Sequence, residues 1–204
     1  MADVADGTTD PGTGVREVLS ETMEFRLLGP FEVERDGQVV ALGGRRQRAV
    51  LALLTMHAGE VLSTDRIVEE IWADDPPPSA TRTVHSYVSR LRSSLRGAPG
   101  DPEVLVRRDP GYVLVVDPRC IDAVRFEHLV DRAVAALDAG DPGSANGALG
   151  DALGLWRGEA LADFAYDAFA STGAQRLDGR RLEAMRQADQ RTRLSDKLFL
   201  KQDV

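Results

Sequence analysis

The chain has 204 residues, of which 43% are hydrophobic and 5% aromatic, so it can form one large domain or two smaller ones, and we expect two. No stretch approaches the run of about 18 apolar residues that a membrane helix requires, and residues 1–22 lack the apolar core of a secretory signal. Cys120 is the only cysteine and the three histidines lie far apart, which excludes an intrachain disulfide and argues against a zinc or catalytic site. We therefore expect a cytoplasmic protein with no membrane partner, no cofactor and no metal.

The net charge of −8 at pH 7 is distributed unevenly along the chain. Residues 1–23 carry five acidic residues and one arginine, a sum of −4, whereas residues 79–108 carry six arginines against Asp101 and Glu103, a sum of +4. A protein that binds the phosphate backbone of DNA needs a local positive surface, which a negative total does not exclude. Residues 79–108 are therefore the candidate DNA-binding segment.

The first ordered elements are expected after residue 22, because residues 1–22 are rich in Gly, Thr and Asp and are typical of a disordered tail. In residues 25–42, strand-like alternation on either side of a two-residue Asp36-Gly37 turn predicts a small antiparallel sheet. Residues 45–58 then predict an amphipathic helix that is closed by Gly59. Its expected buried face consists of Val50, Leu53, Leu54 and His57.

Two further helices are predicted before a β-hairpin. Ser63 can cap a helix over residues 64–72, and a third helix is expected over residues 79–96, after a stiff loop that contains three consecutive prolines. Residues 104–116 then predict a hairpin with Asp109, Pro110 and Gly111 at its tip. The order of sheet, three helices and hairpin is that of a winged helix-turn-helix domain.

The second half of the chain predicts helices alone. Asp122 can cap a helix that runs through Asp138 and is stopped by Gly140. A second helical stretch covers residues 148–156, and its glycines weaken it. A third begins near Ser171.

The third helix of the first half carries the strongest functional signal. A helical wheel places Val84, Val88, Leu91 and Leu95 on one narrow apolar face. The opposite side holds Arg82, Ser86, Ser89 and Ser93, with Arg90 and Arg96 at its edges. No acidic residue occurs from residue 81 to residue 96, which suits an approach to phosphates better than solubility alone. Small hydroxyls and arginines on this face are typical of a helix that reads the major groove, and a merely solvated face is the alternative.

Two other arginine groups extend this positive surface. Arg107 and Arg108 lie beside the hairpin turn, where a wing can deliver arginine to the backbone or minor groove of DNA. Arg46 and Arg48, with Arg45, lie at the start of the first helix. They can add phosphate contacts, and a plain solvated helix start is the equal alternative.

Several segments together resemble the Streptomyces antibiotic regulatory protein family, whose DNA-binding domain is similar to that of the OmpR/PhoB response regulators. These segments are FRLLGPFEV, GGRRQRAVLALL, LSTDRIVEEIW, PPPSATRTVHSYVSRLRSSL and GYVL, within residues 25–116. In the second half, DAVRFEHLV, ALGLWRGEALADF and QRLDGRRLEA resemble the bacterial transcriptional activation domain, which is helical and similar to tetratricopeptide repeats. The resemblance implies a shortened version of that domain here, and we expect its pattern to end after Met185.

The resemblance implies an α+β winged helix-turn-helix domain at residues 23–118, with a small antiparallel sheet, three helices and a C-terminal β-hairpin wing. A partial, all-α, tetratricopeptide-like activation domain follows at residues 119–204. We refer to residues 23–118 as the winged half and to residues 119–204 as the helical half.

The implied function is that of a sequence-specific transcriptional activator. The resemblance implies that it binds direct repeats of double-stranded promoter DNA near the −35 region as a side-by-side homodimer. It is also expected to contact RNA polymerase holoenzyme, through the sigma factor and core subunits, at genes of antibiotic biosynthesis on the nucleoid. The alternative is a DNA-binding antagonist or interaction module that cannot activate. An enzyme is not expected, because the chain lacks the GxxxxGK and GxSxG motifs.

The resemblance also implies site residues. Those expected to contact DNA are Arg82, Thr83, Ser86, Tyr87, Ser89, Arg90 and Arg92. Tyr87 and Arg92 lie nearer the core on the helical wheel, so they are expected to be phosphate or packing residues. Asp74, Asp75 and Pro76 lie where the fold contacts polymerase, and a rigid spacer is the alternative.

Overall fold

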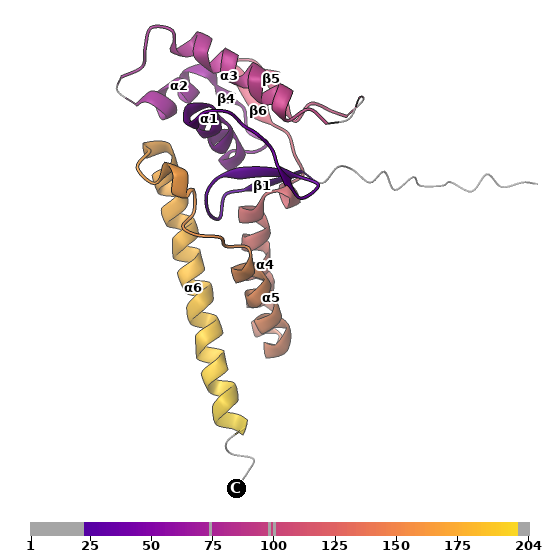
Figure 1. Cartoon of the computed structure of the whole chain (residues 1–204). Helices are drawn as coiled ribbons and strands as arrows, with labels where there is room; N and C mark the ends of the chain where they lie inside the picture. Colours follow the sequence, from indigo (N-terminus) through magenta and orange to yellow (C-terminus); the bar gives the residue numbers. More distant parts are fainter. Residues whose placement is uncertain (1–22, 74, 98, 100, 200–204) are drawn as a thin grey trace, which may run out of the picture.

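The computed structural model describes residues 23–73, 75–97, 99 and 101–199, the last ten of these as backbone alone. The tail expected at residues 1–22 lies outside the described residues. Figure 1 shows the winged half at one end of the molecule, with the long helices of the helical half extending away from it. Within the described part of the chain, no helix has the length and apolar character needed to cross a membrane.

The winged half begins with the antiparallel sheet that the sequence predicts. Its strands are β1 (Met23–Arg26), β2 (Glu32–Arg35) and β3 (Gln38–Val39), in the order β1-β2-β3. Asp36 and Gly37 form the turn between β2 and β3, and both have positive φ angles, of 50° and 77°. A two-residue turn of this kind matches the twist of the flanking strands.

Three helices follow, α1 (Arg45–Met56), α2 (Thr64–Trp72) and α3 (Ala80–Ser94). The Ser63 hydroxyl accepts a hydrogen bond from the Arg66 amide at 3.1 Å, so the predicted cap of α2 is confirmed. Val50, Leu53 and Leu54 of the predicted apolar face of α1 are buried, whereas His57 is half-buried and forms the C-cap of the helix. Burial extends beyond that face to every residue from 49 to 55, because other parts of the chain cover α1 on several sides.

The wing is the predicted hairpin of β5 (Leu105–Arg108) and β6 (Gly111–Leu114). The short strand β4 (Leu62–Ser63), which leads into α2, joins it in a second sheet with the order β4-β6-β5. Gly111 is required at this junction, since a Cβ atom there would lie 1.8 Å from the Leu62 carbonyl oxygen. The wing is therefore anchored to the start of α2.

The helical half contains three long helices, as predicted. A 3-10 turn (Pro118–Cys120) leads into α4 (Asp122–Asp138), and α5 (Pro142–Gly154) packs against α4. A second 3-10 turn (Ala162–Phe164) precedes α6 (Ala168–Phe199), which starts before the predicted Ser171. The fold class predicted from the sequence, a winged helix followed by a helical domain, is confirmed.

Asp122 does not cap α4, so that prediction was wrong. Ile121 is the N-cap, and the Asp122 carboxylate accepts hydrogen bonds from the backbone amides of Leu27 at 2.7 Å and Leu28 at 3.0 Å in the winged half. The side chain is only 2% exposed. Burial raises the pKa of Asp122, although the two amides and the nearby Arg157 guanidinium oppose the shift.

The two halves share one continuous hydrophobic core. The amides of Arg157 and Leu161 donate hydrogen bonds to the carbonyls of Leu28 and Leu27, each at 2.8 Å. The Arg157 guanidinium also lies 2.6 Å from the Glu32 carboxylate. The segment that follows α5 is therefore fixed to the loop that follows β1.

Candidate nucleic-acid interface

The inward face of α3 is built as its sequence predicts. Val84, Val88 and Leu91 are at most 1% exposed and fix the rotation of the helix about its axis. That rotation turns the polar side outward, and the exposed residues of this side are Arg82, Ser86, Ser89, Arg90 and Ser93. Figure 1 shows that α1 and the first sheet lie between α3 and the helical half. The helical half therefore does not cover the polar face of α3.

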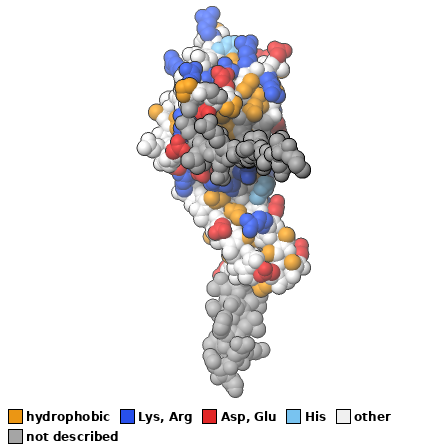
Figure 2. All heavy atoms as spheres, turned by 90° about the vertical axis from the view of Figure 1, so that its right-hand side faces the viewer, with side chains coloured by type: hydrophobic (Ala, Val, Ile, Leu, Met, Phe, Trp, Pro, Cys, Tyr) orange, Lys and Arg blue, Asp and Glu red, His pale blue; other side chains and the backbone are white. Residues whose placement is uncertain are grey.

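The charges on this side of the molecule are available to an outside partner. Among the described residues, no ion pair involves Arg82, Arg90 or Arg96 of the α3 region, or Arg107 or Arg108 of the wing. All five side chains are exposed. Figure 2 shows several blue side chains at the end of the molecule that α3 occupies. Unpaired arginines on one surface attract phosphates.

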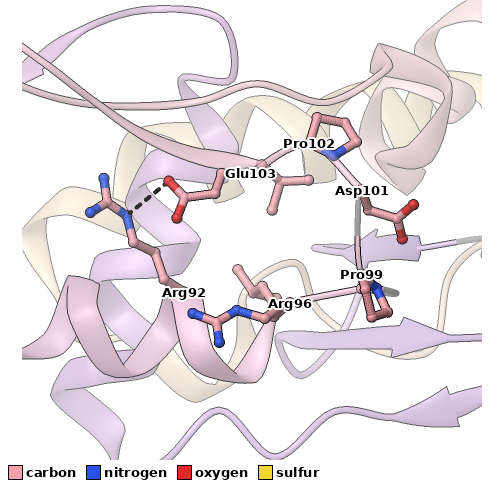
Figure 3. A pocket seen from close by; sticks show the side chains of 9 residues that line it. Arg92, Arg96, Pro99, Asp101, Pro102 and Glu103 are labelled. Atoms are coloured by element: carbon pink, nitrogen blue, oxygen red, sulfur yellow. Dashed lines mark ion pairs between the residues drawn. The ribbon is translucent and has the colours of Figure 1, made fainter.

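Arg92 of α3 is engaged within the protein. Its Nε atom donates a hydrogen bond to the Leu105 carbonyl at 2.7 Å, and its guanidinium lies 5.8 Å from the Tyr112 ring centroid. Figure 3 shows the same side chain beside Glu103, 3.9 Å away. Arg92 thus ties α3 to the wing, which is the packing role that the helical wheel favours.

Thr83 and Tyr87 lie at the margins of this face, whereas Ser93 lies within it. The Thr83 hydroxyl donates to the Ser79 carbonyl at 2.9 Å, and the Ser93 hydroxyl donates to the Ser89 carbonyl at 3.2 Å. Tyr87 is half-buried beside the start of α1. Contact with DNA stays a prediction for these residues, as it does for the other predicted site residues.

The three arginines at the start of α1 differ in their surroundings. Arg46 is exposed, its guanidinium lies 5.7 Å from the Trp72 ring centroid, and it lines an open groove with Tyr87 and Arg90. Arg48 is half-buried and donates a hydrogen bond to the Phe31 carbonyl at 2.7 Å while pairing with Asp163 of the helical half. The structure therefore brings Arg46 to the α3 surface and directs Arg48 away from it.

The acidic partners of these arginines were not predicted from the sequence. Asp163 pairs with Arg48, and Asp167 pairs with Arg45 at 2.7 Å. More than 110 residues separate the partners of each pair, and nothing in the local sequence pattern marks either aspartate.

The loop between α2 and α3 lies beside this surface. Asp74 lies outside the described residues, whereas Asp75 and Pro76 are exposed. The Asp75 amide donates to the Trp72 carbonyl at 3.2 Å, which holds the start of the loop against the end of α2. Both residues are accessible to a protein partner.

Nothing in the described residues suggests metal chemistry. No group of three or more His, Cys, Asp or Glu side chains is placed to hold a metal ion in the part of the chain that the structure describes. Burial raises the pKa of the Cys120 thiol, so this group stays protonated and unreactive near neutral pH.

Two known families match this chain, one in each half of the structure. Residues 37–114 match the family described as transcriptional regulatory protein, C terminal. Residues 121–196 match the bacterial transcriptional activator domain. The two matches correspond to the winged and helical halves.

Individual relatives share this arrangement. The regulatory protein AfsR of Streptomyces coelicolor is 36% identical over 176 residues, which are 86% of this chain and 17% of the relative. The regulatory protein DnrI of Streptomyces peucetius is 33% identical over 147 residues, which are 69% of this chain and 54% of the relative. This chain therefore spans about half or less of the length of these relatives.

A solved structure agrees with the fold of both halves. The Mycobacterium tuberculosis protein EmbR, in complex with a low affinity phosphopeptide, superimposes with a TM-score of 0.77 and 36% identity over 80% of this chain and 44% of that chain. Because both domain matches, the relatives and this structure agree, the chain belongs to the Streptomyces antibiotic regulatory protein family, in which an OmpR/PhoB-type winged helix precedes a bacterial transcriptional activator domain.

Proposed function

We propose that this chain is a sequence-specific, DNA-binding transcriptional activator rather than an enzyme. The observation that carries the proposal is the outer face of α3, which is exposed, free of acidic residues and turned away from the helical half. Ser86 and Ser89 let the helix approach the base edges of the major groove, and Arg90 can bind guanine or phosphate. The wing arginines contact the adjacent backbone.

The relevant measurement is the affinity for promoter duplexes as a function of salt. Each neutralised phosphate contributes a slope of about −0.9 in log affinity against log salt, so a complex with several contacts weakens steeply. Arg90→Ala is expected to cost about 1 to 3 kcal/mol and to relax specificity at one position, whereas Arg107→Ala weakens binding to all sequences alike. Arg132→Ala, at an exposed position of α4, is the matched control. Binding that does not depend on salt would contradict the proposal.

The finer part of the proposal concerns assembly on the promoter. Two protomers lie side by side on direct repeats near the −35 region, in the nucleoid, and the loop of Asp75 and Pro76 contacts RNA polymerase holoenzyme. An acidic, proline-stiffened loop beside the DNA-facing helix supports this role, since it suits a basic partner surface. Transcription with purified polymerase tests it, and Asp75→Asn should reduce stimulation without reducing DNA occupancy. Occupancy without any stimulation by the unaltered protein would point to an antagonist.

A further inference from the structure

Arg45 connects the groove beside α3 to the helical half. It lines that groove with Arg46, Tyr87 and Arg90, and its side chain is 56% exposed. Its guanidinium nevertheless bonds to the helical half, at 2.7 Å from the Asp167 carboxylate and 3.3 Å from the Asp163 carbonyl oxygen. Arg45 thus borders the proposed DNA surface while its charge is bound to an acidic residue of the other half.

The Arg45–Asp167 pair is suited to exchange. The Arg45 side chain is 56% exposed and that of Asp167 is 26% exposed. Water and salt screen ion pairs that reach the surface, and both side chains lose freedom in forming them, so such pairs are weak. A DNA phosphate presents two oxygens to the guanidinium in the same geometry as a carboxylate does. The neighbouring phosphates of the duplex add further electrostatic attraction for the arginine.

Arg45 also bonds to the Asp163 carbonyl, and its guanidinium lies 5.6 Å from the Phe164 ring centroid. Its side chain is nevertheless 56% exposed, whereas that of Arg48 is 31% exposed and is held by both the Phe31 carbonyl and Asp163. Arg45 is therefore the arginine that a DNA phosphate can reach.

We propose that Asp167 competes with a DNA phosphate for Arg45, so that the helical half restrains the affinity of the winged half for DNA. In the free protein Asp167 holds the arginine, and on DNA the arginine transfers to the phosphate backbone beside α3. The inference rests on the proposed function and adds to it a regulatory contact between the halves. Any change that moves Asp167 away from α1 raises DNA affinity.

The test is a double-mutant cycle on the full chain. The probe is a mixed-sequence duplex of about 30 base pairs, roughly three helical turns, at low salt. Asp167→Asn is expected to tighten binding by about 1.5- to 5-fold, which is the range measured for exposed ion pairs, and the gain should shrink as salt is added. In the Arg45→Ala background, Asp167→Asn should have no effect, because the arginine that it would release is absent.

Controls separate exchange from simple repulsion and from misfolding. Asp138→Asn removes an equal charge at the far end of α4 and should leave affinity unchanged. Asp167→Ser also removes the charge while retaining an oxygen before α6, so it must reproduce the effect of Asp167→Asn. If Asp167→Asn tightens binding equally with and without Arg45, or does not tighten it at all, the exchange is refuted while the proposed function stands. If the unaltered protein shows no salt-dependent binding to the duplex, the proposed function fails as well.

Discussion

Replacing Asp122 with alanine removes the acceptor of two buried backbone amides and tests how the halves are joined. The carboxylate lies 2.7 Å from the Leu27 amide and 3.0 Å from the Leu28 amide, and it is 2% exposed. A buried donor left without a partner costs about 1 to 3 kcal/mol, so the two together cost roughly 2 to 6 kcal/mol. Because small proteins have free energies of unfolding of about 5 to 15 kcal/mol, this loss is a large share of the total.

Urea unfolding measures the Asp122→Ala effect and reports on both halves. Trp72 lies in the winged half. Trp156 lies in the helical half, where the centroids of its ring and the Phe126 ring are 5.3 Å apart. With a shared core, the fluorescence of both tryptophans and the circular dichroism should change at one urea midpoint, which the substitution lowers. Asp138→Ala, at an exposed position of α4, should change the free energy by less than about 0.5 kcal/mol. A loss below about 1 kcal/mol for Asp122→Ala would refute the reasoning.

Three further predictions concern stability. Gly111→Ala should detach the wing and abolish DNA binding, because the new Cβ atom would lie 1.8 Å from the Leu62 carbonyl oxygen. Gly147→Ala, on the open surface of α5, should instead raise the free energy of unfolding by about 0.5 to 1 kcal/mol. Equal shifts of the two variants in thermal melts would contradict this difference. Ser63→Ala should cost about 1 kcal/mol in urea unfolding by removing the cap of α2, and an unchanged midpoint would show that the cap adds nothing. Burial raises the pKa of Asp122 in the folded state, so the folded protein holds this proton more tightly than the unfolded chain does. The free energy of unfolding of the unaltered protein, relative to Asp122→Asn, should therefore fall as pH rises from about 4 through the folded-state pKa. A rise over the same pH range would show that the pKa is lowered instead.

Local patterns were sufficient to predict the first sheet, the helices, the hairpin and the orientation of α3, but not the two-residue strand β4. The spacing of Val84, Val88 and Leu91 determines which side of that helix is buried, so the exposed arginine and serine face could be predicted without knowledge of the rest of the chain. The Asp36-Gly37 turn was equally predictable, because few residue pairs adopt two consecutive positive φ angles.

Contacts between the halves were not predictable from such patterns. Asp122 stands where a cap residue is expected, and only the fold brings the amides of Leu27 and Leu28 to it across more than 90 residues of sequence. Arg46 and Arg48 are both arginines at a helix start, yet one is exposed and the other is held by Asp163. Their sequence positions predict the same role for both residues, whereas the tertiary structure gives them different surroundings.

The same contacts determine how a change in the helical half can reach DNA. The buried residues of α1 pack against α3, while Arg45 and Arg48 at the start of α1 are held by the segment before α6. A rigid helix that touches both the DNA-facing element and the helical half couples the two, because packed interiors do not deform continuously. In the proposed exchange, release of Arg45 by Asp167 adds a free positive charge beside α3. The helix α1 is then the element through which the helical half acts on DNA affinity.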